Sequence, residues 1–227
     1  MSITIIIPTY NEEEKLPHLL GQLKEQSAQD MDVFIVDGGS TDQTISIAVQ
    51  YGINVIESGK GRARQMNAAA RLAQTEYLWF MHADTRLLSP VHAYLDEIKS
   101  SNSIWGRFEV KFDDDRVIFR MIAFMMNKRS ALTSIATGDQ AIFIKKNYYE
   151  ESGGFEEIPL MEDIDISKKL KKTSSLYASE LKLQTSARRW KVNGVLRTII
   201  LMWIIRFYYF LGVPAAKLAV MYDNEKS

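Results

Sequence analysis

The sequence predicts an α/β fold in which a mostly parallel, Rossmann-like sheet is flanked by helices. In the first half of the chain, short apolar segments rich in β-branched residues alternate three times with segments whose apolar residues recur at helical spacing. Such alternation is typical of strands joined by right-handed helical crossovers, which produce a parallel sheet. The apolar segments end at glycine and polar residues, which mark the turns between elements.

Length and composition fit one globular domain with a short addition. The chain has 227 residues, and 46% of them are hydrophobic, which excludes wholesale disorder. Basic and acidic residues balance at 28 each, so no bulk field attracts nucleic acid and no nucleic-acid partner is expected. The lack of cysteine excludes disulfides and thiolate metal sites. No basic leader or cleavage site precedes the first strand, so we expect a cytoplasmic location.

Strands and helices are expected in strict order along the first half. The strands cover residues 3–7, 33–36, 54–57 and 77–81. The first helix lies within residues 11–26 and begins near Pro17, since proline is favoured at the first helical position. Ser40 or Thr41 is expected to cap the second helix, and the third covers residues 62–73.

The second half alternates less regularly. We expect strands at residues 105–112 and 140–144, and helices at residues 117–129 and 161–171. Residues 1–190 are assigned to one domain and residues 191–227 to an apolar helical appendage. Arg206 lies near the middle of the apolar segment 195–211, where a membrane span would make it cost about 2.5–3.5 kcal/mol. We therefore expect this segment to pack on the domain, on a second copy of the chain, or on the cytoplasmic face of a membrane.

Polar residues and glycines follow each predicted strand of the first half. Ligands of open parallel sheets bind beyond the carboxyl ends of the strands, so these residues are expected to line one site. They are Thr9, Tyr10, Asn11, Asp37, Gly38, Gly39, Ser58, Gly59, Lys60, His82, Ala83 and Asp84.

In order and spacing, these strand ends resemble glycosyltransferase family 2. The matching segments are residues 8–12 (PTYNE), 36–42 (VDGGSTD), 59–67 (GKGRARQMN), 82–85 (HADT), 153–155 (GGF) and 162–163 (ED). The resemblance covers roughly residues 1–190. It implies the A-type glycosyltransferase fold and an inverting enzyme of the hexosyltransferase type with a UDP-sugar donor. The basic segment and the His-Ala-Asp triplet are similar to a bacterial subgroup named for arsenosugar biosynthesis.

The resemblance implies a nucleotide site at the four strand ends of the first half. It consists of Pro8, Thr9, Tyr10, Glu12, Asp37, Gly38, Lys60, Arg62, Arg64, Asn67 and Ala83. In the family, the residue at Asp37 accepts a hydrogen bond from uracil, although Asp-Gly is also a common turn signal. Cations at the start of a helix oppose its dipole at roughly 0.3–1 kcal/mol each, and a bound diphosphate would reverse that penalty. A solvated basic turn is the alternative for Lys60, Arg62 and Arg64.

A divalent metal, Mn²⁺ or Mg²⁺, is expected at the fourth strand end. The family usually has Asp-x-Asp there, whereas this chain has His82-Ala83-Asp84. We expect Asp84 to be the main ligand and His82 a secondary one, because neutral imidazole binds Mn²⁺ but suits Mg²⁺ less well. Asp113 and Asp115 form a rival acidic pair, although such acidic runs are usually solvated turns.

The acidic run 162–165 opens a predicted helix and supplies the catalytic candidates Asp163 and Glu162. Acids there also suit the helix dipole, which is the structural alternative. Helical spacing turns Asp163 inward with Ile166, and Glu162 toward solvent and Lys169. An inward carboxylate suits a general base, and the resemblance names Asp163 in that role.

Two further segments are expected on the acceptor side. Gly138 and Asp139 precede a predicted strand, where a structural turn is the equal alternative. Arg189 and Trp190 end a segment similar to the Gln-x-x-Arg-Trp motif of processive family members. Ser186 replaces the glutamine of that motif, which weakens the case for a polymer synthase.

The predicted function is transfer of a sugar from a nucleotide-sugar donor to a hydroxyl-bearing acceptor, either a lipid or a small molecule. Two other functions remain open from the sequence. A sugar-phosphate nucleotidyltransferase also uses a basic loop beside a parallel sheet, and would release pyrophosphate. A non-catalytic, membrane-associated module would bind no donor.

Overall fold

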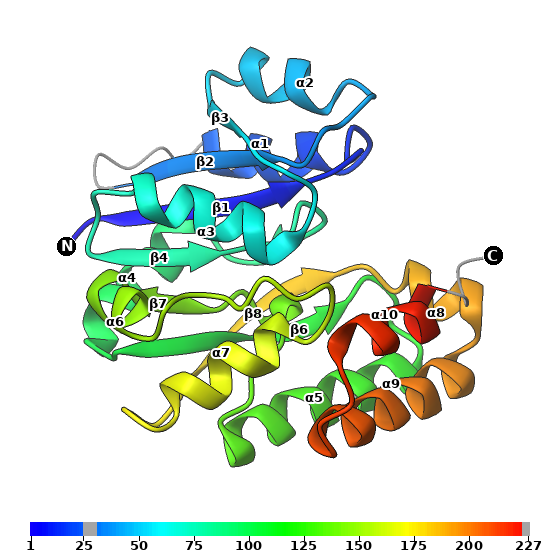
Figure 1. The fold of residues 1–227 in the computed structure, drawn as a ribbon. Coiled ribbons are helices and arrows are strands. Elements are labelled where there is room, and N and C mark those ends of the chain that lie inside the picture. The colour runs from blue at the N-terminus through cyan, green and yellow to red at the C-terminus, as the bar shows by residue number, and fades with distance from the viewer. Residues whose placement is uncertain (25–30, 224–227) are drawn as a thin grey trace.

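A computed structural model describes residues 1–24 and 31–223 of the chain, and these residues form an eight-stranded sheet covered by helices (Figure 1). The strands are β1 (Ile3–Thr9), β2 (Met31–Asp37), β3 (Asn54–Glu57), β4 (Tyr77–Phe80), β5 (Arg86–Leu87), β6 (Trp105–Phe112), β7 (Phe143–Lys145) and β8 (Tyr177–Thr185). The helices are α1 (Leu16–Lys24), α2 (Thr44–Gln50), α3 (Arg62–Leu72), α4 (Val91–Ser101), α5 (Val117–Thr133), α6 (Lys146–Glu151), α7 (Glu162–Leu170), α8 (Arg188–Asn193), α9 (Val195–Phe210) and α10 (Ala215–Asp223), with a 3-10 turn η1 (Gly138–Gln140).

The sheet has a parallel half and a mixed half. Its strand order is β3-β2-β1-β4-β7-β6-β8-β5, and the first four strands are parallel to one another. Strand β7 is antiparallel to both β4 and β6, and β8 is parallel to β6. The predicted α/β architecture with a mostly parallel sheet is thus confirmed. The mixed half is where the periodicity of the sequence was weakest.

Strand β1 is buried on both faces and separates two layers of core. Ile3, Ile5 and Ile7 pack on one side with α1, α2 and α4. Ile6 packs on the other side with α3, α6 and α7. Successive strand side chains point to opposite faces, so a continuous apolar run is what a doubly covered strand requires.

Arg107 fastens α5 to the mixed half of the sheet. It is 1% exposed and donates hydrogen bonds to Ser130 Oγ (3.0 Å), the Ser179 carbonyl (2.9 Å) and the Asn127 carbonyl (3.1 Å). These partners belong to β8 and α5, so one guanidinium holds three elements together. Burial holds the pKa of Arg107 below its ordinary value.

The C-terminal helices pack on α5 and on the start of α7. Trp190, Val195 and Ile199 pack against a cluster that includes Phe119 and Ile122 of α5. A separate cluster joins Ile205 of α9 and Leu218 of α10 to Leu160, Met161 and Ile164. Within residues 1–24 and 31–223, no helix is long and apolar enough to cross a membrane.

Several predicted boundaries differ from the structure. Neither Ser40 nor Thr41 caps α2, which begins only at Thr44, and the Asp42 carboxylate accepts the Thr44 N–H there at 3.0 Å. Strand β7 begins at Phe143 because the residues before it form the turn η1. Helix α1 begins close to Pro17, and residues 25 and 26 of the predicted helix lie outside the described part.

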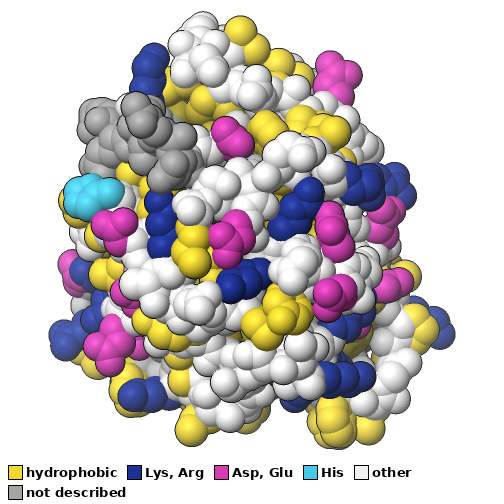
Figure 2. Space-filling model, turned by 90° about the vertical axis from the view of Figure 1, so that its left-hand side faces the viewer, with side chains coloured by type: hydrophobic (Ala, Val, Ile, Leu, Met, Phe, Trp, Pro, Cys, Tyr) yellow, Lys and Arg dark blue, Asp and Glu magenta, His cyan; other side chains and the backbone are white. Residues whose placement is uncertain are grey.

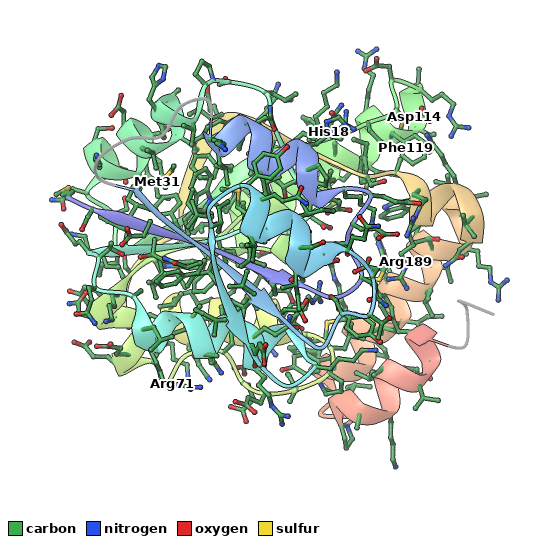
Figure 3. All side chains as sticks on the ribbon, turned by 90° about the horizontal axis from the view of Figure 1, so that it is seen from above. His18, Met31, Arg71, Asp114, Phe119 and Arg189 are labelled. Atoms are coloured by element: carbon green, nitrogen blue, oxygen red, sulfur yellow. The ribbon has the colours of Figure 1, made fainter. Side chains whose placement is uncertain are left out.

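The face at the amino ends of the parallel strands, where the N-terminus lies, has interspersed positive and negative side chains (Figure 2). The predicted site residues come from the opposite, carboxyl ends. In Figure 3, Met31 at the start of β2 and Arg189 of α8 lie at opposite sides of the molecule.

We predict that Gly106→Ala lowers the free energy of unfolding by about 1–3 kcal/mol, because the added methyl group overpacks the sheet. A Cβ at Gly106 would lie 2.3 Å from Phe143 Cζ and 2.7 Å from the Tyr177 carbonyl oxygen. The matched control is Gly21→Ala in α1, where the nearest atom is Tyr51 Oη at 4.0 Å. That change should raise stability by about 0.5–1 kcal/mol. Urea unfolding measures both, and an unchanged Gly106→Ala midpoint would contradict the close packing of β6 on β7.

Candidate functional site

The ends of β1 and β2 form a closely bonded loop pair around Asp37. This carboxylate is 1% exposed and accepts the N–H groups of Gly39 (2.8 Å) and Ser40 (2.7 Å). It also accepts the hydroxyls of Ser40 (2.5 Å) and Thr9 (3.3 Å). Asp37 therefore shapes the turn that the Asp-Gly pair indicated. A nucleotide would meet a loop that is already organised.

Gln65 is a buried contributor that the sequence analysis did not select. Its Nε2 donates to the carbonyls of Thr9 (2.8 Å) and Val36 (2.7 Å), which joins α3 to both strand ends. A Cβ at Gly38 would lie 3.1 Å from the same nitrogen, so glycine is needed there for close approach. A lone glutamine on a predicted helix gave no signal of this role.

The first loop is held from both sides. Pro8 is buried within β1, while the ring of Tyr10 is 40% exposed and carries Lys60 Nζ 3.8 Å above its centre. The Glu12 N–H donates to Thr44 Oγ1 at 2.8 Å, and its carboxylate pairs with Lys15 at 3.0 Å. The exposed Tyr10 ring is thus the flat surface of this loop.

Helix α3 begins at the basic segment with its first N–H groups uncapped by any side chain. Its N-cap is Gly61, with φ at 137°. Arg62 Nη2 lies 2.7 Å from Glu162 Oε1, and Arg64 Nε lies 3.2 Å from Glu157 Oε2. Partial loss of solvent opposes the charge of Arg62, whose side chain is 44% exposed, but Glu162 and the neighbouring carboxylates raise its pKa above the ordinary value. The segment is therefore part of an ionic network and differs from a freely solvated turn.

Asn67 stabilises a turn instead of facing these loops. Its Nδ2 donates to the Phe155 carbonyl at 2.8 Å, and its Oδ1 accepts the Phe155 N–H at 3.1 Å. The Tyr149 hydroxyl donates to the same oxygen. All three contacts fix the glycine turn before Phe155, so a nucleotide role for Asn67 remains a prediction.

His82 and Asp84 lie on either side of the buried Ala83 at the end of β4. His82 Nδ1 is 3.3 Å from Asp139 Oδ1, and a Cβ at Gly138 would lie 2.6 Å from His82 Nε2. Burial opposes protonation of His82, but its hydrogen bond to Asp139 raises its pKa overall. Burial likewise opposes ionisation of Asp139, whose pKa is nevertheless lowered by His82.

Of these residues, Asp84 fits a divalent metal best. Mg²⁺ is commonly held by one or two carboxylates together with substrate phosphates, and does not need a full protein cage. No group of three or more His, Asp or Glu residues within residues 1–24 and 31–223 could hold a metal alone, so donor phosphates would have to complete the site. Both nitrogens of His82 are close to other groups, which leaves the Asp84 carboxylate as the better ligand.

The rival acidic pair serves other contacts. Asp113 accepts the Ala187 N–H at 2.7 Å, and Asp115 pairs with Lys111 at 3.0 Å. Neither residue lines the cavity that contains Asp84. The pair therefore fastens the turn between β6 and α5.

Helix α7 begins with Glu162 and Asp163 both directed into the site. Glu162 is 3% exposed and is held by Arg62, so the prediction that it faces solvent and Lys169 is wrong. Ile166 follows Glu162 by four residues as well as Asp163 by three, so both acids lie next to the buried stripe, with Glu162 buried and Asp163 half-buried. Lys169 pairs instead with Asp165, at 2.9 Å.

Asp163 has the environment of a base. Its Oδ2 accepts the Gly138 N–H at 3.0 Å, and its Oδ1 accepts the Ile164 N–H at 2.8 Å. Burial, and then the charge of Glu162, raise its pKa to about 6, despite Arg62. A carboxylate with a pKa near the operating pH is both ionised and able to take a proton.

Part of the predicted site lines one cavity of about 670 Å³, whereas Tyr10, Asp37 and Lys60 of the donor loops do not line it. Arg62, His82, Asp84 and Asp163 all line it. The four predicted acceptor residues, Gly138, Asp139, Arg189 and Trp190, line it as well. The structure thus brings together residues from α3, α7, α8, η1 and the segment that follows β4.

Two lining residues, Arg129 of α5 and Arg206 of α9, were not selected as site residues. Each is a cation on a helix that is rich in apolar residues and contains no Asp or Glu, and that composition was the available signal. From the sequence, Arg206 was informative only because a charged residue disfavours a membrane span.

The fold belongs to the A-type glycosyltransferases, as solved structures show. The mannosyltransferase PcManGT from Pyrobaculum calidifontis, in complex with GDP-Man and Mn²⁺, is 19% identical with a TM-score of 0.67, over 90% of this chain and 64% of that one. TarS 1–349 from S. aureus, in complex with UDP-GlcNAc, is 20% identical with a TM-score of 0.64, over 82% of this chain and 58% of that one.

The chain belongs to glycosyltransferase family 2, whose model matches residues 4–153. A PGL/p-HBAD biosynthesis glycosyltransferase from Mycobacterium bovis is 33% identical over 138 residues, which cover 52% of this chain and 54% of the relative. The chain thus spans about half the length of the mycobacterial relatives that it matches. The predicted family is confirmed.

We predict that sugar transfer is lost as the pH falls through about 6, because a protonated Asp163 cannot accept a proton. Glu162→Gln removes a charge that raises the pKa of Asp163, so the acidic limb should move to lower pH. Asp163→Asn should cost about 10²–10⁴-fold in turnover at neutral pH, and less below pH 6, while donor binding persists. Turnover at saturating donor, measured across acid and neutral pH, tests all three statements.

The matched control for this series is Asp165→Asn, which lies on the same helix but pairs with Lys169. It should keep the pH profile of the unaltered protein. A larger loss for Glu162→Gln than for Asp163→Asn would reverse the two assignments. Small losses for both would move the base elsewhere, with Asp139 the next candidate.

Proposed function

We propose that this protein is an inverting glycosyltransferase of the hexosyltransferase type that moves a sugar from a UDP-sugar to a hydroxyl acceptor. One observation carries the proposal. The carboxylate with the raised pKa, Asp163, shares a cavity with the cation Arg62 and the carboxylate Asp84. A base, a cation for phosphate and a metal ligand are the three groups that such a transfer needs.

In the proposed reaction, Asp163 takes the proton of the acceptor hydroxyl as its oxygen attacks the anomeric carbon of the donor. The bond from that carbon to the diphosphate oxygen breaks on the opposite face, so the configuration inverts and UDP leaves. Glu162 keeps the pKa of Asp163 high and holds Arg62 in place. A divalent ion, Mn²⁺ or Mg²⁺, held by Asp84 would neutralise charge on the leaving diphosphate.

The uridine preference rests on the first two strand ends. The Tyr10 ring and the turn set by Asp37 form an exposed flat surface beside a buried carboxylate. TarS has been solved with UDP-GlcNAc and PcManGT with GDP-Man, so relatives of this fold accept different bases. The choice of uridine in this chain is therefore our proposal.

We also propose a division of labour along the chain. Residues 1–190 carry the transfer site, and residues 191–227 complete the acceptor side. The outer stripes of α5 and α9 expose apolar side chains, and neither helix contains Asp or Glu. These features support contact with the cytoplasmic face of a membrane, and a second copy of the chain is the other partner that such stripes could accept.

We predict that UDP binds and that Asp37→Ala weakens its affinity about tenfold or more, which is the scale of one hydrogen bond to a charged group. Calorimetric titration with UDP-, GDP- and TDP-sugars measures the preference. The control is Asp32→Ala, an exposed carboxylate on the same strand. Unchanged UDP affinity in a folded Asp37→Ala protein would remove Asp37 from the site. Release of pyrophosphate from a nucleoside triphosphate would favour the nucleotidyltransferase alternative instead.

We predict that Asp84→Ala abolishes the part of donor binding that depends on Mn²⁺. Calorimetry with and without Mn²⁺ separates that part from the metal-independent affinity. The double change at Asp113 and Asp115 to alanine is the control, because neither lines the cavity. If that control loses the Mn²⁺ effect and Asp84→Ala keeps it, the metal site has been misplaced.

A further inference from the structure

The cavity has one wall that transfer from the donor does not require. Helices α5 and α9 build this wall mainly from Ile122, Met126, Ile199 and Met202. These apolar side chains offer no hydrogen bonds to a sugar or a nucleotide. Helix α3, with the basic segment, packs on β1 and β2, whereas α5 packs on β6 and β8. The apolar wall therefore lies over the opposite half of the sheet from the donor loops.

Two arginines in this apolar wall have buried nitrogens that no described residue pairs. Nε and Nη2 of Arg129 and Nε of Arg206 are buried and have no hydrogen-bond partner among the residues that the structure describes. Both side chains line the same cavity as Asp163. Buried charged donors are normally paired, because leaving one unpaired is costly. A ligand with acceptor oxygens would meet the unused donors.

The charges near the two arginines do not supply that acceptor. Burial lowers the pKa of Arg129, and the Asp163 carboxylate opposes this effect only through its field. Asp163 itself accepts the N–H groups of Gly138 and Ile164. No Asp or Glu occurs in α5, α8 or α9, although each of these helices carries at least two Lys or Arg. This side of the cavity is thus complementary to an anion.

The apolar wall continues to the outside. Met125 of α5 is 55% exposed and Trp203 of α9 is 65% exposed, yet both line the cavity. They sit where α5 and α9 present their outer apolar stripes, and the two helices lie side by side in Figure 1. A ligand could therefore extend an apolar chain through this mouth while its polar end stays near the arginines.

We infer that the acceptor is an anionic amphiphile, in which an apolar chain lies between α5 and α9 and a phosphate or carboxylate binds Arg129 and Arg206. The inference rests on the proposed function, since it names the acceptor class for that same cavity. Guanidinium groups bind either anion through paired N–H donors, which a lysine could not reproduce. The reacting hydroxyl then reaches Asp163 from the apolar side, opposite the donor loops.

The test measures the binding of four probes. Intrinsic tryptophan fluorescence reports binding, because Trp190 and Trp203 line the cavity. The probes are decyl phosphate, decanoate, decanol and inorganic phosphate, each below its aggregation concentration. We expect decyl phosphate or decanoate to bind at least about tenfold more tightly than decanol, since a charged hydrogen bond is lost in the alcohol. Whichever anion binds more tightly identifies the head group. Inorganic phosphate should bind weakly, because it lacks the chain.

The arginine variants Arg129→Gln and Arg206→Gln should each remove most of the anion preference and leave decanol affinity unchanged. The matched control is Arg120→Gln, an exposed arginine on α5 that does not line the cavity. Should the variants fail to fold, the unaltered protein still decides, because affinity for alkyl phosphates must rise about fourfold with each added methylene. Equal binding of decanol and decyl phosphate, or no dependence on chain length, would overturn the inference.

A parallel UDP titration separates this inference from the proposed function. Retained UDP binding with no anion preference would refute only the acceptor class. Retained amphiphile binding without any nucleotide binding would refute the proposed transfer and leave a lipid-binding cavity. Loss of the anion preference in Arg120→Gln would mean that the probes bind the outer surface, and would also count against the inference.

Discussion

The ion pair between Arg62 and Glu162 is the interaction on which the cavity depends. At 2.7 Å it joins the start of α3 to the start of α7, and so connects the donor half of the sheet to the acceptor half. The Glu162 side chain is 4% exposed and that of Arg62 is 44% exposed, so water screens part of the attraction while the contact still positions the two helix ends. The other oxygen of Glu162 is buried and has no hydrogen-bond partner among the described residues, and the charge of Glu162 acts on Asp163.

The same pair explains how one site can need both a cation and a base with a high pKa. A cation beside Asp163 would by itself lower the pKa of that carboxyl and weaken it as a proton acceptor. Burial, and then the like charge of Glu162, raise the pKa of Asp163 by more than Arg62 lowers it. A cation that binds phosphate and a carboxylate that accepts a proton can therefore lie in the same cavity.

The parallel half of the fold could be predicted because its information is local. Each strand there is a short apolar run, and each helix follows it directly, so periodicity alone located β1, β3 and α3. The mixed half depends on pairings between distant segments, such as β6 with β8, and its elements α4, α6 and β8 were not predicted. The prediction of the Glu162 orientation was wrong for a related reason, since that orientation is decided by Arg62, a hundred residues earlier in the chain. The arginines of the apolar wall were not predicted as site residues, because the sequence does not show which two helices face each other.

Gly138 contacts both the Asp163 carboxylate and the His82 imidazole, which have separate roles in the proposed reaction. Its N–H is donated to Asp163, and its Cα lies against the imidazole of His82, next to the carboxylate that would hold the metal. No side chain larger than hydrogen fits between them. A side chain at position 138 would displace either the imidazole or this peptide, and with the peptide its hydrogen bond to the Asp163 carboxylate. The tolerance of this position to substitution is therefore set from two sides at once, by the histidine and by the acid.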